Sequence, residues 1–133
     1  MSMTDAAPHK VAVIVGSLRQ GSINEQLARA LAKLALPAME LTIVPIADLP
    51  LYNPDIDGST PAADVFRAAV GAADAVLFVT PEYNRSIPAP MKNALDWGSR
   101  PYGQACLAGK PAASIGASPA RWARRRRSSR CGP

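Results

Sequence analysis

The segment Lys10-Val-Ala-Val-Ile-Val15 decides the fold of this chain. It is β-branched and uninterrupted, a pattern typical of a strand buried on both faces of a parallel sheet. The segment ends at Gly16, and Ser22 with Glu25 three residues later matches the capping box, in which each side chain satisfies a backbone N–H of the other residue. This strand, loop and helix start predict the opening of an α/β unit.

Apolar residues continue along the predicted helix at helical spacing. Leu27, Leu31 and Leu34 follow one another at intervals of four and three residues, which predicts that they form its inner face. Pro37 ends the element because proline cannot continue a helix.

The same alternation of strand and helix repeats along the chain. Strands are predicted over 41–44, 75–79 and 111–115. One helix is predicted to begin at Pro61, and its inner face comprises Val65, Phe66, Ala69 and Val70. Another is predicted from near Pro90 to Gly98, and its inner face comprises Met91, Ala94, Leu95 and Trp97. The proline-rich connection 45–60 is long enough to be functional or mobile. The pattern therefore predicts a doubly wound α/β parallel sheet, whose ligands bind beyond the carboxyl ends of the strands.

Length and composition restrict the class of protein. The 133 residues fit one domain, and 48% of them are hydrophobic but only 5% aromatic, so aliphatic side chains should dominate the core. No apolar run is long enough to span a bilayer, and the N-terminus lacks a signal-peptide pattern. We therefore predict a cytoplasmic protein. Cys106 and Cys131 are too far apart in sequence to suggest a metal or redox pair.

The net charge of +5 is concentrated at the C-terminus. Six of the 15 basic residues lie in the last thirteen positions, and the remaining nine face ten acidic residues. The rest of the chain is thus nearly neutral, so we expect neither a nucleic-acid nor a membrane partner. A nucleic-acid-binding function would depend on the tail alone.

The loop Gly16-Ser-Leu-Arg-Gln-Gly-Ser-Ile-Asn24 joins the first strand to a helix N-terminus. Free backbone N–H groups, several polar side chains and Arg19 predict a phosphate site there. The loop lacks the P-loop motif and G-x-G-x-x-G, and Val44-Pro45-Ile46 offers no acidic residue for a ribose. This favours one terminal phosphate monoester over a pyrophosphate. The alternative is a polar turn that only caps the helix.

The loop Pro81-Glu-Tyr-Asn-Arg-Ser-Ile-Pro-Ala-Pro90 follows the third strand. Its three prolines restrain the backbone, which would limit the ordering cost of ligand binding. Tyr83 is suited to pack on a flat heterocycle, while backbone N–H groups of Tyr83 and Asn84 meet the heteroatoms of that ring. The alternative is a proline-rich turn with a surface tyrosine.

Together with Met91-Lys-Asn-Ala-Leu-Asp96-Trp97, the two loops resemble the NADPH-dependent FMN reductases, which include bacterial quinone, azo-dye and chromate reductases. The resemblance runs from about Lys10 to Pro119. It implies a flavodoxin-like sheet of order 2-1-3-4-5, with FMN between strands one and three. By resemblance, the FMN phosphate is held by Ser17, Arg19, Ser22, Ile23 and Asn24. The isoalloxazine is bordered by Pro81, Glu82, Tyr83, Asn84 and Ser86, with Ser118 nearby.

The resemblance also implies a reaction. By resemblance, hydride passes from NADPH or NADH to FMN and then to a small-molecule acceptor. The resemblance also implies that the protein forms a homodimer or homotetramer. No catalytic acid or base and no metal is expected, because the flavin carries the chemistry. We interpret His9 as a spectator, and Glu82 and Asp96 as structural or subunit contacts. The alternative is a flavin- or phosphate-binding module, or a defective truncated relative, without turnover.

The resemblance ends after Gly116-Ala-Ser-Pro119. We interpret 1–119 as an incomplete FMN-binding domain that lacks the fifth strand and last helices of the family. The Arg-rich tail 120–133 is expected to be disordered or to result from a single-base deletion that shifted the reading frame.

Overall fold

The computed structural model describes residues 6–119, in which strands and helices alternate. The elements are β1 (His9–Val15), α1 (Ile23–Ala35), β2 (Met39–Ile43), the 3-10 turn η1 (Pro54–Ile56), α2 (Pro61–Gly71), β3 (Ala75–Val79), α3 (Ala89–Gly98) and β4 (Ala112–Ile115). None of the helices described is both long and apolar enough to cross a membrane. The predicted tail 120–133, its frameshift interpretation and the predicted absence of later elements lie outside the described residues.

The four strands form one parallel sheet of order β2-β1-β3-β4. This order confirms the flavodoxin-like prediction for the strands present. The central strand β1 pairs with β2 on one side and β3 on the other, and residues 11–15 are buried, as their apolar run predicts. Among the described strands β4 lies at an edge of the sheet, and all four of its residues are exposed.

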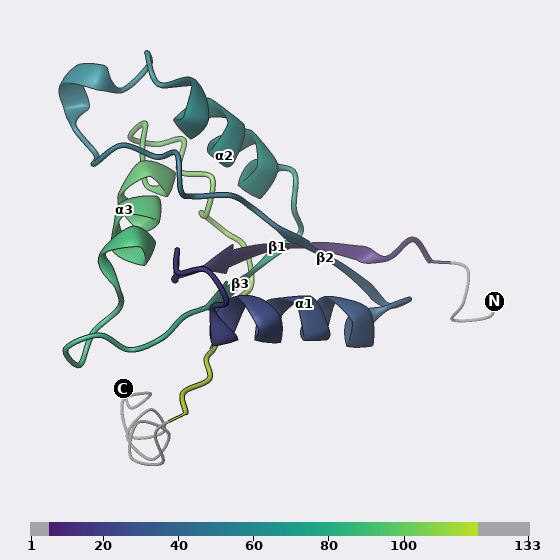
Figure 1. Ribbon diagram of the computed structural model, residues 1–133. Coiled ribbons are helices and arrows are strands. Elements are labelled where there is room, and N and C mark those ends of the chain that lie inside the picture. The colour runs from purple at the N-terminus through teal and green to yellow at the C-terminus, as the bar shows by residue number, and fades with distance from the viewer. Residues whose placement is uncertain (1–5, 120–133) are drawn as a thin grey trace, which may run out of the picture.

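Helices cover both faces of the sheet, with α1 on one face and α2 and α3 on the other (Figure 1). The core under α2 and α3 is the larger and contains Phe66, Trp97, Met91 and Ile14. The core under α1 consists of Val13, Val15, Ala28 and Val79, with half-buried side chains around it. This arrangement leaves the carboxyl ends of β1 and β3 free to carry loops.

Three residues predicted to face the core are exposed. Leu34 is 80% exposed and Val65 67%, and Ala69 is exposed as well. At about 100° per residue, Leu34 lies about 120° around α1 from the buried Ala28, so it cannot share that contact. Val65 and Ala69 each precede a buried residue of α2, Phe66 or Val70, and are therefore turned away from the core.

The connection 45–60 is held in place by α3. The Tyr52 N–H donates to Asn93 Oδ1 at 2.9 Å, and Trp97 Nε1–H donates to the Pro50 carbonyl at 2.7 Å. The Tyr52 and Trp97 rings meet edge to face, with centroids 5.0 Å apart. Asn93 and Trp97 thus anchor this connection, a role that sequence analysis did not identify.

A charged pair fastens the same connection to α2. Arg67 Nη1 lies 2.9 Å from Asp57 Oδ1, and Arg67 Nε–H donates to the Trp97 carbonyl at 3.0 Å. The guanidinium also lies over the Trp97 ring, 5.4 Å from its centroid. The hydrogen bond from Arg67 lowers the pKa of Asp57 below its ordinary value.

Candidate functional site

The loops that follow β1, β3 and β4 meet around one cavity of about 200 Å³. Its lining comprises Ser17, Arg19, Ser22, Ile23, Asn24, Pro81, Glu82, Tyr83, Ala117, Ser118 and Pro119. Nine of the eleven predicted site residues are therefore brought together, and Asn84 and Ser86 are not among the lining residues. Ala117 and Pro119 were not predicted, although they flank the predicted Ser118.

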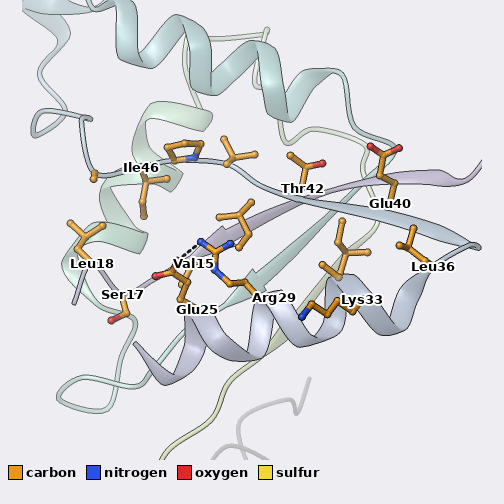
Figure 2. A pocket seen from close by; sticks show the side chains of 16 residues that line it. Val15, Ser17, Leu18, Glu25, Arg29, Lys33, Leu36, Glu40, Thr42 and Ile46 are labelled. Carbon is orange, nitrogen blue, oxygen red and sulfur yellow. Dashed lines mark hydrogen bonds and ion pairs between the residues drawn. The ribbon is translucent and has the colours of Figure 1, made fainter. Parts of the chain in front are cut away.

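Ser22 is the N-cap of α1, as predicted, and its buried hydroxyl accepts from the Glu25 N–H at 3.3 Å. The other half of the predicted capping box is wrong. The Ser22 N–H donates to the Arg19 carbonyl at 3.2 Å, so it does not need the Glu25 carboxylate. Glu25 instead pairs with Arg29, one turn on, at 2.7 Å (Figure 2).

Two features of the cavity favour an anion, although the carboxylate of Glu82 also lines it. The N-terminus of the 13-residue helix α1 contributes the positive end of the helix dipole and N–H groups without helical partners. Arg19 is exposed at the rim and forms no ion pair with any of residues 6–119. Together with the hydroxyls of Ser17 and Ser22, these groups suit a phosphate.

Gly16 allows the ends of β1 and β3 to approach closely below the cavity. Its N–H donates to the Val79 carbonyl at 2.8 Å. A Cβ added at Gly16 would lie 2.3 Å from Thr80 Oγ1 and 2.9 Å from Thr80 Cβ. The absence of a side chain at this position thus lets the loops after the two strands lie next to each other.

Residues 83–86 form a tight turn with two reciprocal backbone hydrogen bonds. The Tyr83 N–H donates to the Ser86 carbonyl at 2.9 Å, and the Ser86 N–H donates back at 3.0 Å. Asn84 and Arg85 both have positive φ, 49° and 65°, as a type I′ turn requires. The prediction that the Tyr83 N–H meets a ligand ring is therefore wrong for this structure, because the turn already uses that donor.

The dimensions of the cavity fit part of an FMN molecule. At about 200 Å³ it is smaller than the roughly 300 Å³ or more typical of a site that encloses a whole drug-sized ligand. It can take a phosphate and the start of a polyol chain, and leaves a ring system outside. Tyr83, 50% exposed at the rim, offers an aromatic surface for such a ring.

A larger, open groove of about 1020 Å³ runs between the side of α1 and β2 (Figure 2). Of the predicted site residues only Ser17 lines it. Its charged side chains are Glu25, Arg29, Lys33 and Glu40, whose charges balance, and Ser22, Ile23 and Asn24 at the start of α1 do not line it. The groups suited to bind an anion thus line the smaller cavity.

Other titratable residues lie away from this cavity. His9 is exposed at the opposite end of β1, and Asp96 pairs with Lys92 on α3. Burial raises the pKa of the half-buried Cys106 thiol. No cluster of His, Cys, Asp and Glu within residues 6–119 is suited to hold a metal ion.

Comparisons with known sequences identify a family and several relatives. A sequence model of the family described as NADPH-dependent FMN reductase matches residues 9–129. A quinone reductase of Pseudomonas putida is 55% identical over 113 residues, which make up 84% of this chain and 61% of the relative. A 2-hydroxy-1,4-benzoquinone reductase of a Burkholderia species is 54% identical over 110 residues, 82% of this chain and 60% of the relative.

A solved structure also matches. The flavoenzyme FerB of Paracoccus denitrificans, an NAD(P)H:(acceptor) oxidoreductase, superposes with a TM-score of 0.81 at 48% identity. The match covers 85% of this chain and 63% of FerB. The chain thus spans about three fifths of the length of the relatives it matches.

Proposed function

This chain belongs to the NADPH-dependent FMN reductase family, and from that premise we propose that it binds FMN and acts as an NAD(P)H oxidoreductase. In this proposal hydride passes from NADPH or NADH through FMN to quinones, azo compounds, chromate or similar acceptors. The observation that carries it is the single cavity at the N-terminus of α1, lined by residues from three separate loops.

The proposed phosphate subsite consists of Ser17, Arg19, Ser22, Ile23 and Asn24. Arg19 would supply a charge-assisted hydrogen bond, and the two serines would donate their hydroxyl protons. Ile23 and Asn24 occupy the first two positions of α1, so their backbone N–H groups lack helical acceptors and would contribute to binding the phosphate.

The proposed ring subsite lies at the rim. Pro81 and Glu82 line the cavity beside Tyr83, whose exposed ring would pack against the isoalloxazine. Asn84, Ser86 and Ser118 are included in the proposal on the family resemblance. The I′ turn would hold the first two in a fixed backbone conformation.

Bound FMN would supply the hydride chemistry, so the protein would need to bind, orient and shield the reactants rather than transfer protons itself. The name of the Pseudomonas relative favours quinones among the possible acceptors. The family resemblance also supports a homodimer or homotetramer and a cytoplasmic location as parts of this proposal.

Reduction followed by reoxidation tests the proposed function. The FMN-loaded protein is mixed with NADPH without oxygen and then with a benzoquinone. We expect the flavin absorbance to bleach and then recover. Bleaching without recovery would contradict quinone as acceptor, and a bound flavin that NADPH does not bleach would favour the binding module without turnover.

A matched pair of variants tests the location of the site. Arg19→Gln removes a charge-assisted hydrogen bond worth about 1.5 to 3 kcal/mol and should weaken FMN binding about tenfold to a hundredfold. Lys33→Gln removes the same charge from the last turn of α1 and should leave FMN binding unchanged. Equal effects of the two substitutions would contradict the assigned site.

A further inference from the structure

The side chain of Asn24 is directed at the protein backbone across the cavity. It is 4% exposed and makes two hydrogen bonds to a single residue, Ala117. Nδ2–H donates to the Ala117 carbonyl at 3.2 Å, and Oδ1 accepts from the Ala117 N–H at 2.9 Å. Both ends of the side-chain amide therefore already bond the backbone, and the second Nδ2–H takes no part in these two bonds.

These two bonds join two walls of the cavity that are far apart in sequence. Asn24 belongs to the first turn of α1, and Ala117 to the segment 116–119 that follows β4. Within residues 6–119 the strand itself gives this segment limited support, because β4 is there an edge strand whose four residues are exposed. The last backbone hydrogen bond between the β3 and β4 segments joins the Thr80 N–H to the Ile115 carbonyl, two residues before Ala117.

We propose that Asn24 is a positioning residue, whose side chain holds residues 116–119 against α1 and so sets the width of the cavity. Any contact of Asn24 with phosphate is then made by its backbone N–H. This assignment rests on the proposed function for the identity of the ligand, but not for the hydrogen bonds themselves.

The two bonds match the chemistry of an asparagine side chain. Ala117 presents one donor and one acceptor, and the side-chain amide returns one of each from two different atoms. An aspartate would keep the bond to the Ala117 N–H, but its second oxygen would face the Ala117 carbonyl and repel it. Alanine would lose both bonds.

Amide hydrogen exchange in the ligand-free protein tests the positioning role without flavin. We expect the Ala117 amide, followed by NMR, to exchange about tenfold faster or more in Asn24→Ala. Gln26→Ala is the matched control, because its exposed amide bonds the Gly21 carbonyl and not Ala117. Unchanged Ala117 exchange in folded Asn24→Ala would overturn the proposal.

A measurement on the wild-type chain covers the case in which Asn24→Ala does not fold. The side-chain Nδ2 protons of Asn24 should exchange with solvent more slowly than the side-chain Nε2 protons of the exposed Gln26. Equal exchange of the two amides would overturn the proposal.

FMN titrations, combined with Ala117 exchange, then separate positioning from direct phosphate contact. If Asn24 acts through the 116–119 wall, Asn24→Ala should weaken FMN binding and speed Ala117 exchange together. Weaker FMN binding with unchanged Ala117 exchange would assign the side chain to the phosphate and overturn the proposal. A wild-type chain that does not bind FMN would contradict the proposed function, and Ala117 exchange would then decide the positioning role alone.

Discussion

Gly16→Ala tests how closely β1 and β3 must approach beneath the site. The added Cβ would lie 2.3 Å from Thr80 Oγ1, whereas ordinary contacts begin at 3.4 Å, so about 1 Å of movement is required. Rotation of the Thr80 hydroxyl would not suffice, because Thr80 Cβ itself would lie at 2.9 Å. Movement of the backbone is opposed by the hydrogen bonds from the Gly16 N–H to Val79 and from the Thr80 N–H to Ile115.

We expect this overpacking to lower the free energy of unfolding by about 1 to 3 kcal/mol. Urea denaturation measures the loss. FMN affinity should fall as well, because Ser17 and Pro81 directly follow the two displaced residues and line the cavity.

Gly71→Ala is the matched control. Gly71 ends α2, and a Cβ there would meet nothing within 4 Å. Alanine is preferred to glycine in helices, so this variant should be as stable as the wild type or more stable. A Gly16→Ala variant as stable as Gly71→Ala, with unchanged FMN affinity, would refute the reasoning.

Three further substitutions test the core and the anchored connection. Trp97→Phe removes the indole N–H that donates to the Pro50 carbonyl, which keeps Asn93 Nδ2–H as a donor at 2.9 Å, so the substitution should cost about 0.5 to 1.5 kcal/mol in urea denaturation. Phe66→Ala empties a buried position and should cost about 3 to 5 kcal/mol in the same measurement, whereas a loss below 1 kcal/mol would contradict its place in the core. Asp57→Asn removes the partner of Arg67. Because Arg67 lowers the pKa of Asp57, the pair stabilises the fold above the ordinary pKa of 3.8, and that stabilisation disappears as the pH falls through the lowered value. The stability difference from wild type should therefore be largest near neutral pH and shrink in acid, and a difference independent of pH would contradict the pairing.

The sequence predicted the elements and their order because the signals for them are local. The run at 11–15 identifies a central strand without reference to any other residue, and β3 was predicted with its observed bounds of 75–79. Which helix residues face the core was predicted less well. Adjacent apolar residues such as Val65 and Phe66 point about 100° apart, and only packing against the sheet decides which of them is buried.

The predictions that failed at the site involve competition between hydrogen-bond partners. Glu25 has both a cap and Arg29 within reach, and the sequence does not indicate which one prevails. The Tyr83 N–H was assigned to a ligand although the I′ turn uses it. Two asparagine contacts, one of them outside the site, were not predicted at all: Asn24 and Asn93 bond residues 93 and 41 positions away, and no local pattern encodes such pairs.

Phosphorus-31 NMR of FMN tests the central claim most directly, because it observes the phosphate itself. Free FMN should titrate near the second phosphate pKa of about 6. In the presence of the protein we expect the resonance to shift. We also expect the phosphate to remain a dianion at lower pH than in free FMN, because the α1 N-terminus and Arg19 favour the charged form. Arg19→Gln should return the titration toward that of free FMN. A resonance that titrates like free FMN while the flavin fluorescence is quenched would place the phosphate outside the cavity and contradict the account.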